Sequence, residues 1–198
     1  MLKVAITGGI GSGKSLVCQV FKTLGIPIFN ADAVSNQLVE NNKELKKAII
    51  KLFGAEAYVN NEYNRKYIGQ IVFNNPDKLQ LLNDLIHPLA IQAAKQWFEK
   101  QQAPYAIKEA AILFESNAQQ DIDIVIGVTA PEPLRIERVM QRTGYSKDEV
   151  IKRIQLQMPE VEKMAKCDYV IQNDNNTAII PQLLRIHEAL LIKSNTIE

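Results

Sequence analysis

Short apolar runs alternate along this chain with longer segments in which apolar residues recur at helical spacing. Such alternation is typical of βαβ units, whose strands form a parallel sheet covered by helices. The runs that we predict as strands are 2–7, 26–29, 104–108, 122–129 and 168–172. The helices predicted around them are 13–24, 131–142, 177–192 and one that begins at Ser146. The expected fold class is α/β, with a parallel sheet of about five strands flanked by helices.

The stretch 32–102 has a different pattern, because it is polar, mostly helical in period and without strand-like runs. Turns are predicted near Asn41-Asn42 and from Tyr58 to Asn64. We therefore expect a helical insertion at one edge of the sheet. The chain of 198 residues suits a single domain. Its predicted core consists of 1–31, 103–130 and 159–198.

Composition and charge narrow the function classes. The net charge is +1, from 23 Lys and Arg against 22 Asp and Glu, so no bulk attraction to nucleic acid or acidic membranes is indicated. No apolar stretch approaches the roughly 18–20 residues that cross a bilayer, and the first apolar run is too short for a signal peptide. Cys18 and Cys167 form no metal or redox pattern, which favours buried free thiols. We expect a cytoplasmic protein.

A glycine-rich segment follows the first predicted strand and opens the first predicted helix. Its residues Gly8-Gly9-Ile10-Gly11-Ser12-Gly13-Lys14-Ser15 match the G-x-x-x-x-G-K-[ST] pattern. Glycines let successive backbone N–H groups converge on phosphate oxygens, and the helix N-terminus adds positive potential. Lys14 would reach the β and γ phosphates, and the Ser15 hydroxyl would ligate Mg²⁺. The segment predicts a nucleoside triphosphate site in a P-loop NTPase-type sheet, but it says little about the acceptor.

Motifs of other nucleotide-using proteins are missing. A GTPase switch needs Asp-x-x-Gly and Asn-Lys-x-Asp, and no Asp of this chain is followed three residues later by Gly. A small-molecule kinase needs only the loop, an acid that activates the acceptor, a substrate pocket and a basic lid. We favour such a kinase and leave two alternatives open. One is a kinase for another small molecule, such as a nucleoside, nucleotide or sugar acid, and the other is a nucleotide-dependent switch without an acceptor.

The candidate acid is Asp32, which follows the second predicted strand. Carboxyl ends of parallel strands border the ligand crevice, so Asp32 is expected beside the phosphate loop. There it would accept the proton of the attacking hydroxyl, or orient that hydroxyl and help to hold Mg²⁺. The alternative is a helix N-cap, because the residues from Ala33 onward are helical in pattern.

The candidate lid is the segment 131–158. Arg135, Arg138 and Arg142 recur at spacings of three and four, which places them on one helical face. Arginines that converge on a phosphate suit the charge of a transferring phosphoryl group. The alternative is a solvated basic face, which we favour for Arg135.

Six blocks of the chain together resemble a known family, the dephospho-CoA kinases. They are 7–15, Asn30-Ala31-Asp32, His87-Pro88-Leu89, Ile112-Leu113-Phe114-Glu115, 138–142 and Asp168-Tyr169-Val170-Ile171, and they span nearly the whole chain. The resemblance implies ATP-dependent phosphorylation of the ribose 3′-hydroxyl of dephospho-CoA, the last step of coenzyme A synthesis.

The resemblance also implies roles for individual residues. ATP would bind the residues from Gly11 to Leu16, and Arg138 would lie near them. Asp32 would activate the acceptor, while Lys14 and Arg142 stabilise the transferring phosphate. The insertion 32–102 would hold dephospho-CoA, with His87 in the acceptor pocket, and 131–158 would close over ATP. We expect ATP, Mg²⁺ and dephospho-CoA as the ligands of a monomer or weak homo-oligomer.

Three positions depart from the family pattern. Asn30 stands where the family usually has Asp, which puts help with Mg²⁺ from this position in doubt. Ala111 replaces a proline. Asn175 replaces a glycine after the last strand, and Asn can adopt the left-handed backbone that the turn needs. Glu115, also counted as a substrate-site candidate, has two open roles, a cap of the next helix or a partner of a lid arginine.

Overall fold

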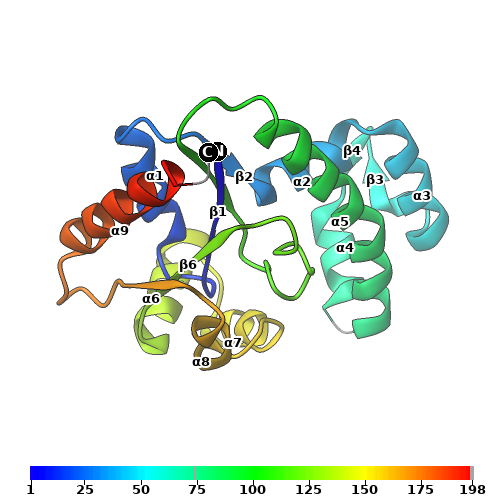
Figure 1. Cartoon of the computed structure of the whole chain (residues 1–198). Coiled ribbons are helices and arrows are strands. Elements are labelled where there is room, and N and C mark those ends of the chain that lie inside the picture. Colours follow the sequence, from blue (N-terminus) through cyan, green and yellow to red (C-terminus); the bar gives the residue numbers. More distant parts are fainter. Residues whose placement is uncertain (74, 197–198) are drawn as a thin grey trace. The chain divides into compact units, whose positions relative to one another are not determined.

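The computed structural model describes residues 1–73 and 75–196, and its largest feature is a five-stranded parallel sheet. The strands are β1 (Leu2–Thr7), β2 (Ile28–Asn30), β5 (Tyr105–Glu109), β6 (Ile124–Thr129) and β7 (Tyr169–Gln172). Their order is β2-β5-β1-β6-β7, and Figure 1 labels β1, β2 and β6 among them. The predicted α/β class and parallel sheet are confirmed. The predicted strand ends differ by up to two residues, and the prediction for β5 stops one residue short, at Lys108 instead of Glu109.

Helices cover both faces of this sheet, which explains why β1 is apolar along nearly its whole length. On one face, α1 (Lys14–Thr23) and α9 (Ile179–Ser194) pack on the strands, and Phe21 and Leu183 join Ile126 and Val128 in one fully buried core. An added Cβ at Gly127 would point the opposite way, toward α8 (Glu160–Ala165), and would lie 2.6 Å from Met164 Sδ. A side chain at position 127 would therefore require the Met164 side chain to move.

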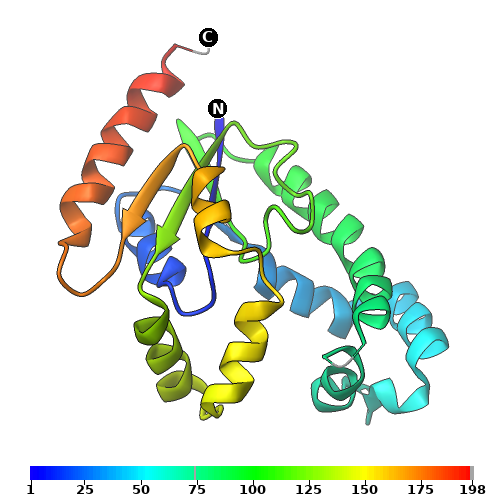
Figure 2. The same cartoon turned by 90° about the horizontal axis from the view of Figure 1, so that it is seen from below.

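Two helices, α6 (Glu132–Thr143) and α7 (Lys147–Gln155), form a hairpin between β6 and α8 (Figure 2). Gly144 ends α6 with a left-handed backbone, φ 72°. Ser146 and Glu149 form the capping box that begins α7, as the sequence predicts. Ile136, Val139 and Val150 hold the two helices together.

Residues Ala31–Gln96 form a second compact unit with its own core, and Met1–Asn30 with Trp97–Glu198 form the first. The second unit contains α2 (Ala31–Asn41), α3 (Lys43–Phe53), a short 3₁₀ helix (Ala55–Ala57), β3 (Tyr58–Val59), β4 (Glu62–Tyr63), α4 (Arg65–Val72) and most of α5 (Pro76–Phe98). Its core includes Val39, Ile49, Phe53 and Ile68.

The expectation that 32–102 lacks strands is wrong, because β3 and β4 pair as an antiparallel hairpin where a turn was predicted. Strands of two residues are too short to show alternation in a sequence. The turn between them carries positive φ at both Asn60 (49°) and Asn61 (72°), as a two-residue hairpin turn of type I′ requires. None of the helices in the described part combines the length and apolarity needed to cross a bilayer.

Candidate active site

The glycine-rich loop connects the carboxyl end of β1 to α1, as predicted, with Gly13 at the N-cap position of α1. Gly11 (φ 79°) and Gly13 (φ 97°) have left-handed backbones. Neither has room for a side chain, because a Cβ would overlap the Arg135 carbonyl oxygen at Gly11 and the Asn173 amide at Gly13. Asn173 Nδ2 also donates to the Ser12 carbonyl oxygen at 2.8 Å. Close packing against Arg135 and the hydrogen bond from Asn173 therefore fix the curved conformation of the loop.

Lys14 folds back over this loop. It is 9% exposed, and its Nζ donates to the carbonyl oxygens of Gly8 (2.9 Å) and Gly9 (3.2 Å). The ammonium group consequently lies at the first part of the loop, while the amides at the start of α1 lie at its other end. This arrangement places one mobile positive charge and a series of N–H donors around one site, which suits a chain of phosphates.

Glu109 is a buried carboxylate beside the loop that the sequence analysis missed. It ends β5, the neighbour of β1, and its register partner is Ile6. Glu109 Oε1 accepts the Ser15 hydroxyl at 2.8 Å, and Oε2 accepts Asn30 Nδ2 at 2.9 Å. The predicted strand stopped one residue before Glu109. The rule that carboxyl ends of strands border the site would have found Glu109 had that strand end been predicted correctly.

Asn30 therefore acts as a donor to the site's carboxylate. An Asp at this position would place a second negative charge against Glu109 Oε2, where the like charges repel. The amide avoids that repulsion and keeps Glu109 oriented toward Ser15. Asn30 therefore contributes to the site as a neutral hydrogen-bond donor.

The oxygen ligands around Ser15 suit Mg²⁺ among the biological metals. Mg²⁺ is usually bound through one or two protein oxygens together with phosphates and waters, and a closed protein cage is unusual. Ser15 and Glu109 supply one hydroxyl and one carboxylate. Within 1–73 and 75–196 there is no group of three His, Cys, Asp or Glu that could hold a metal. The donor set fits an ion shared with a bound phosphate.

Arg135 differs from the solvated role favoured for it, and that prediction is wrong. Its side chain is buried at 4% exposure, and Nη1 lies 2.7 Å from Glu160 Oε2. Glu160 Oε1 in turn accepts the Thr129 hydroxyl at 2.7 Å. A side chain at Gly9 would overlap Arg135 Nη1. A buried charged group requires such a partner. The ion pair lies directly against the loop at Gly9.

The other lid arginines have separate environments. Arg138 Nη2 donates to the Asn173 carbonyl oxygen at 3.1 Å and to Asn175 Oδ1 at 2.6 Å. Asn175 has φ 68°, so the left-handed turn expected after the last strand is present. Arg142 is exposed in the last turn of α6. The three guanidinium groups thus do not share one environment in this structure, although Arg138 remains near the loop through Asn173.

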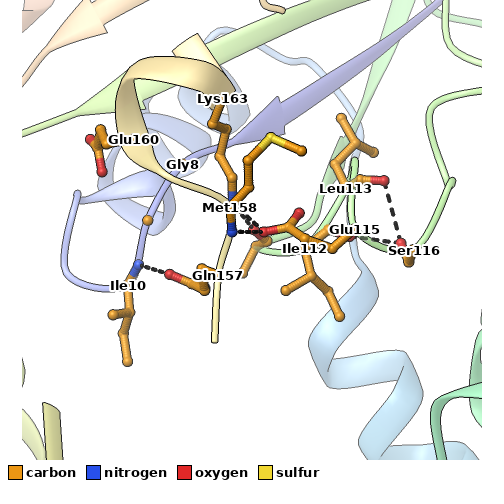
Figure 3. A network of polar contacts seen from close by, with 12 residues as sticks. Gly8, Ile10, Ile112, Leu113, Glu115, Ser116, Gln157, Met158, Glu160 and Lys163 are labelled. Atoms are coloured by element: carbon orange, nitrogen blue, oxygen red, sulfur yellow. Dashed lines mark hydrogen bonds and ion pairs between the residues drawn. The ribbon is translucent and has the colours of Figure 1, made fainter. Parts of the chain in front are cut away.

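Glu115 pairs with a lysine. Its Oε1 lies 2.8 Å from Lys163 Nζ and accepts the Met158 N–H at 2.9 Å (Figure 3). Burial alone would raise the pKa of Glu115, but these hydrogen bonds outweigh it and hold the pKa below its usual value. Lys163 is fully buried and also donates to the Ala111 carbonyl oxygen at 2.9 Å. No helix begins directly after Glu115, so the capping role is wrong; the next helix is α6.

Three further predicted residues lie on the helices α2, α5 and α1. Asp32 is exposed in the first turn of α2, which begins at Ala31, so Asp32 does not occupy the N-cap. His87 is half-buried on α5 before Pro88. Leu16 is 50% exposed on α1. Asp32 and His87 belong to the second unit, and their approach to the phosphate loop stays a prediction.

Comparisons with known proteins agree with one another. The family model described as dephospho-CoA kinase matches residues 2–178. A dephospho-CoA kinase of Chlorobium chlorochromatii is 38% identical, over 96% of this chain and 94% of that protein. The crystal structure of TT1252 from Thermus thermophilus superposes with a TM-score of 0.83 at 32% identity, covering 97% of each chain. A dephospho-CoA kinase from Campylobacter jejuni gives 0.69 at 26% identity, covering 96% of this chain and 98% of the other.

Proposed function

Because the chain belongs to the dephospho-CoA kinase family, we propose which of its residues carry out each part of that reaction. The activity is the ATP-dependent phosphorylation of dephospho-CoA in coenzyme A biosynthesis. The observation that carries the residue assignment is the phosphate loop, with Lys14 Nζ folded over the carbonyl oxygens of Gly8 and Gly9. The phosphates of ATP bind the amides of residues 11–16, and Lys14 neutralises the β and γ phosphates.

Ser15 and Glu109 hold Mg²⁺ in this proposal. The Ser15 hydroxyl would ligate the ion, and Glu109, which accepts that hydroxyl at 2.8 Å, would orient it. When bound, the ion neutralises charge on the β and γ phosphates. Asn30 keeps Glu109 in place by donating to its other oxygen.

Asp32 is the residue that we assign to the acceptor. It accepts the proton of the ribose 3′-hydroxyl while that oxygen forms a bond to the γ phosphorus. The bond from the γ phosphorus to the β–γ bridging oxygen breaks, and ADP leaves with that oxygen. Arg142, on the exposed end of α6, stabilises charge on the phosphoryl group after the 131–158 lid closes. The residues 32–102, including His87, bind dephospho-CoA.

Two further assignments complete the proposal. Glu115 positions the segment after α7 through Met158 and Lys163, and a contact of Glu115 with the substrate stays a prediction. The enzyme works in the cytoplasm as a monomer or weak homo-oligomer, without nucleic-acid or membrane partners. The near-neutral charge supports this expectation.

The test is direct product analysis. Purified protein is incubated with Mg²⁺, ATP and dephospho-CoA, and coenzyme A is measured by mass spectrometry while a coupled assay follows ADP. A panel of nucleosides, nucleotides and sugar acids tests the alternative kinases. Coenzyme A formation that exceeds turnover of every other acceptor supports the proposal. ADP release that no acceptor stimulates would indicate a nucleotide-dependent switch.

A further inference from the structure

Gln157 contacts the phosphate loop from a distant part of the chain. It lies two residues beyond the end of α7, and its Oε1 accepts the backbone N–H of Ile10 at 2.8 Å. Ile10 is the third residue of the glycine-rich segment, between Gly9 and Gly11. Figure 3 shows this contact as the link between the loop and the segment that precedes α8. No part of the proposed mechanism above uses Gln157.

The backbone beside Gln157 is anchored independently of the loop. The Met158 N–H donates to Glu115, which is also paired with the fully buried Lys163. Glu160, three residues after Gln157, is paired with Arg135. Hydrogen bonds to charged groups are stronger than neutral ones, so these contacts hold the segment in place. Gln157, at the end of the 131–158 lid, therefore reaches the loop from backbone that these contacts anchor.

The two sides of the Gln157 amide offer different chemistry. Oε1 is an acceptor and is used by Ile10, while Nε2 carries two N–H donors on the same planar group. Over the described ranges the structure records no hydrogen bond from Nε2. Lys14 Nζ bonds to Gly8 and Gly9, directly before Ile10, so the cation for the terminal phosphate and the Gln157 amide lie at the same part of the loop. Donors placed there suit phosphate oxygens.

The choice of a neutral side chain is informative. Two carboxylates next to Gln157 in the structure, Glu115 and Glu160, are also acceptors, and each faces a buried cation. A carboxylate would also accept the Ile10 N–H, and more strongly than an amide does. It would, however, place a negative charge beside a bound triphosphate. An amide accepts from the loop without that repulsion and supplies donors as well.

We propose that Gln157 positions the terminal phosphate of ATP, with Oε1 holding the Ile10 amide and Nε2 donating to a γ-phosphate oxygen. The proposal rests on ATP binding at the glycine-rich loop. It differs from a purely structural tie, in which Gln157 only attaches the segment after α7 to the loop. The two roles make opposite predictions for Gln157→Glu. A structural tie would keep its acceptor in this variant, whereas a phosphate contact would acquire a repulsive charge.

The experiment compares Gln157→Glu, Gln157→Leu and the matched control Gln120→Glu. Gln120 is exposed in the turns before β6 and lies outside the 131–158 lid, so its substitution adds the same charge away from the proposed ATP site. Binding of Mg²⁺-ATP is measured by calorimetry, coenzyme A formation by steady-state kinetics, and stability by thermal melting. We expect Gln157→Glu to weaken ATP binding about tenfold or more, because charges close together in a partly buried site interact strongly.

In the expected result, Gln157→Leu is less impaired in ATP binding than Gln157→Glu, although it loses the bond to Ile10. The control stays within about twofold of wild type, as expected for a solvent-screened charge. The KM for dephospho-CoA stays unchanged in all three. Gln157→Glu that binds ATP as the control does, or no worse than Gln157→Leu, overturns the proposal. If Gln157→Leu does not fold, the comparison of Gln157→Glu with the control still tests the proposal. Calorimetry measures ATP binding without an acceptor. A wild type that binds ATP but forms no coenzyme A would therefore contradict the proposed function and not the role of Gln157.

Discussion

Ser15 Oγ donates to Glu109 Oε1 at 2.8 Å, and this hydrogen bond joins the first turn of α1 to the end of β5. Glu109 is 7% exposed and accepts Asn30 Nδ2 with its other oxygen. The carboxylate is thus oriented before any ligand binds, with one oxygen directed at the hydroxyl proposed to ligate Mg²⁺. A group aligned in advance need not be reordered when the metal and nucleotide arrive.

Glu109→Gln should raise the Mg²⁺ concentration required for half-maximal coenzyme A formation by about 10- to 100-fold, the usual effect of losing a partner of a metal ligand. The physical reason is loss of the negative charge beside Ser15. A Mg²⁺ titration at saturating ATP measures the effect. Glu99→Gln removes an exposed carboxylate and serves as the control. An unchanged Mg²⁺ requirement in Glu109→Gln would exclude Glu109 from the metal site.

Asp32→Asn should lower kcat by about 10²- to 10⁴-fold, the range that general base catalysis contributes. ATP binding should stay near wild type, because the proposed role concerns only the acceptor. Asp77→Asn is the matched control, since Asp77 is also exposed in the first turn of its helix, α5. Steady-state kinetics and calorimetry separate the two effects. Wild-type turnover in Asp32→Asn would remove the acceptor-activation role.

Glu115→Gln should destabilise the protein by about 3–5 kcal/mol near neutral pH, because it leaves Lys163 buried without its counter-charge. The pKa of Glu115 is lowered in the folded state, so its stabilising effect is present above the ordinary pKa of about 4.3 and is lost as pH falls through the lower folded value. The difference in unfolding free energy between wild type and variant should therefore shrink in acid. Denaturant titrations at several pH values test this, with exposed Glu162→Gln as the control.

Neither cysteine should react readily with a thiol reagent in the native protein at pH 8. Burial, and next the charge of Glu109, raise the pKa of Cys18 far above its usual value. Burial and then Asp168 raise the pKa of Cys167 to about 11. Since the thiolate is the reactive form, both thiols remain protonated and slow. Absorbance with an aromatic disulfide should report two thiols only after unfolding in guanidinium, and rapid native labelling would contradict the expectation.

Much of the fold and part of the site were predictable from local patterns. The strands of the sheet have apolar runs, and the loop has glycines whose conformations no other residue adopts easily, so each is visible in a short window of sequence. The hairpin at 58–63 was missed because its strands have two residues each. Arg135 was misjudged because a buried arginine depends on a partner, Glu160, that lies 25 residues further along the chain and is not implied by helical spacing.

The sequence by itself determined the chemistry that the chain carries: a phosphate loop, its lysine and serine, and motifs of one kinase family in order. The tertiary structure decided which other groups face that loop. Glu109 reaches Ser15 across 94 residues and Gln157 reaches Ile10 across 147. These contacts exist because β5 and β6 pair on either side of β1 and α8 packs on β6, and no periodicity within a segment encodes the order in which distant strands pair.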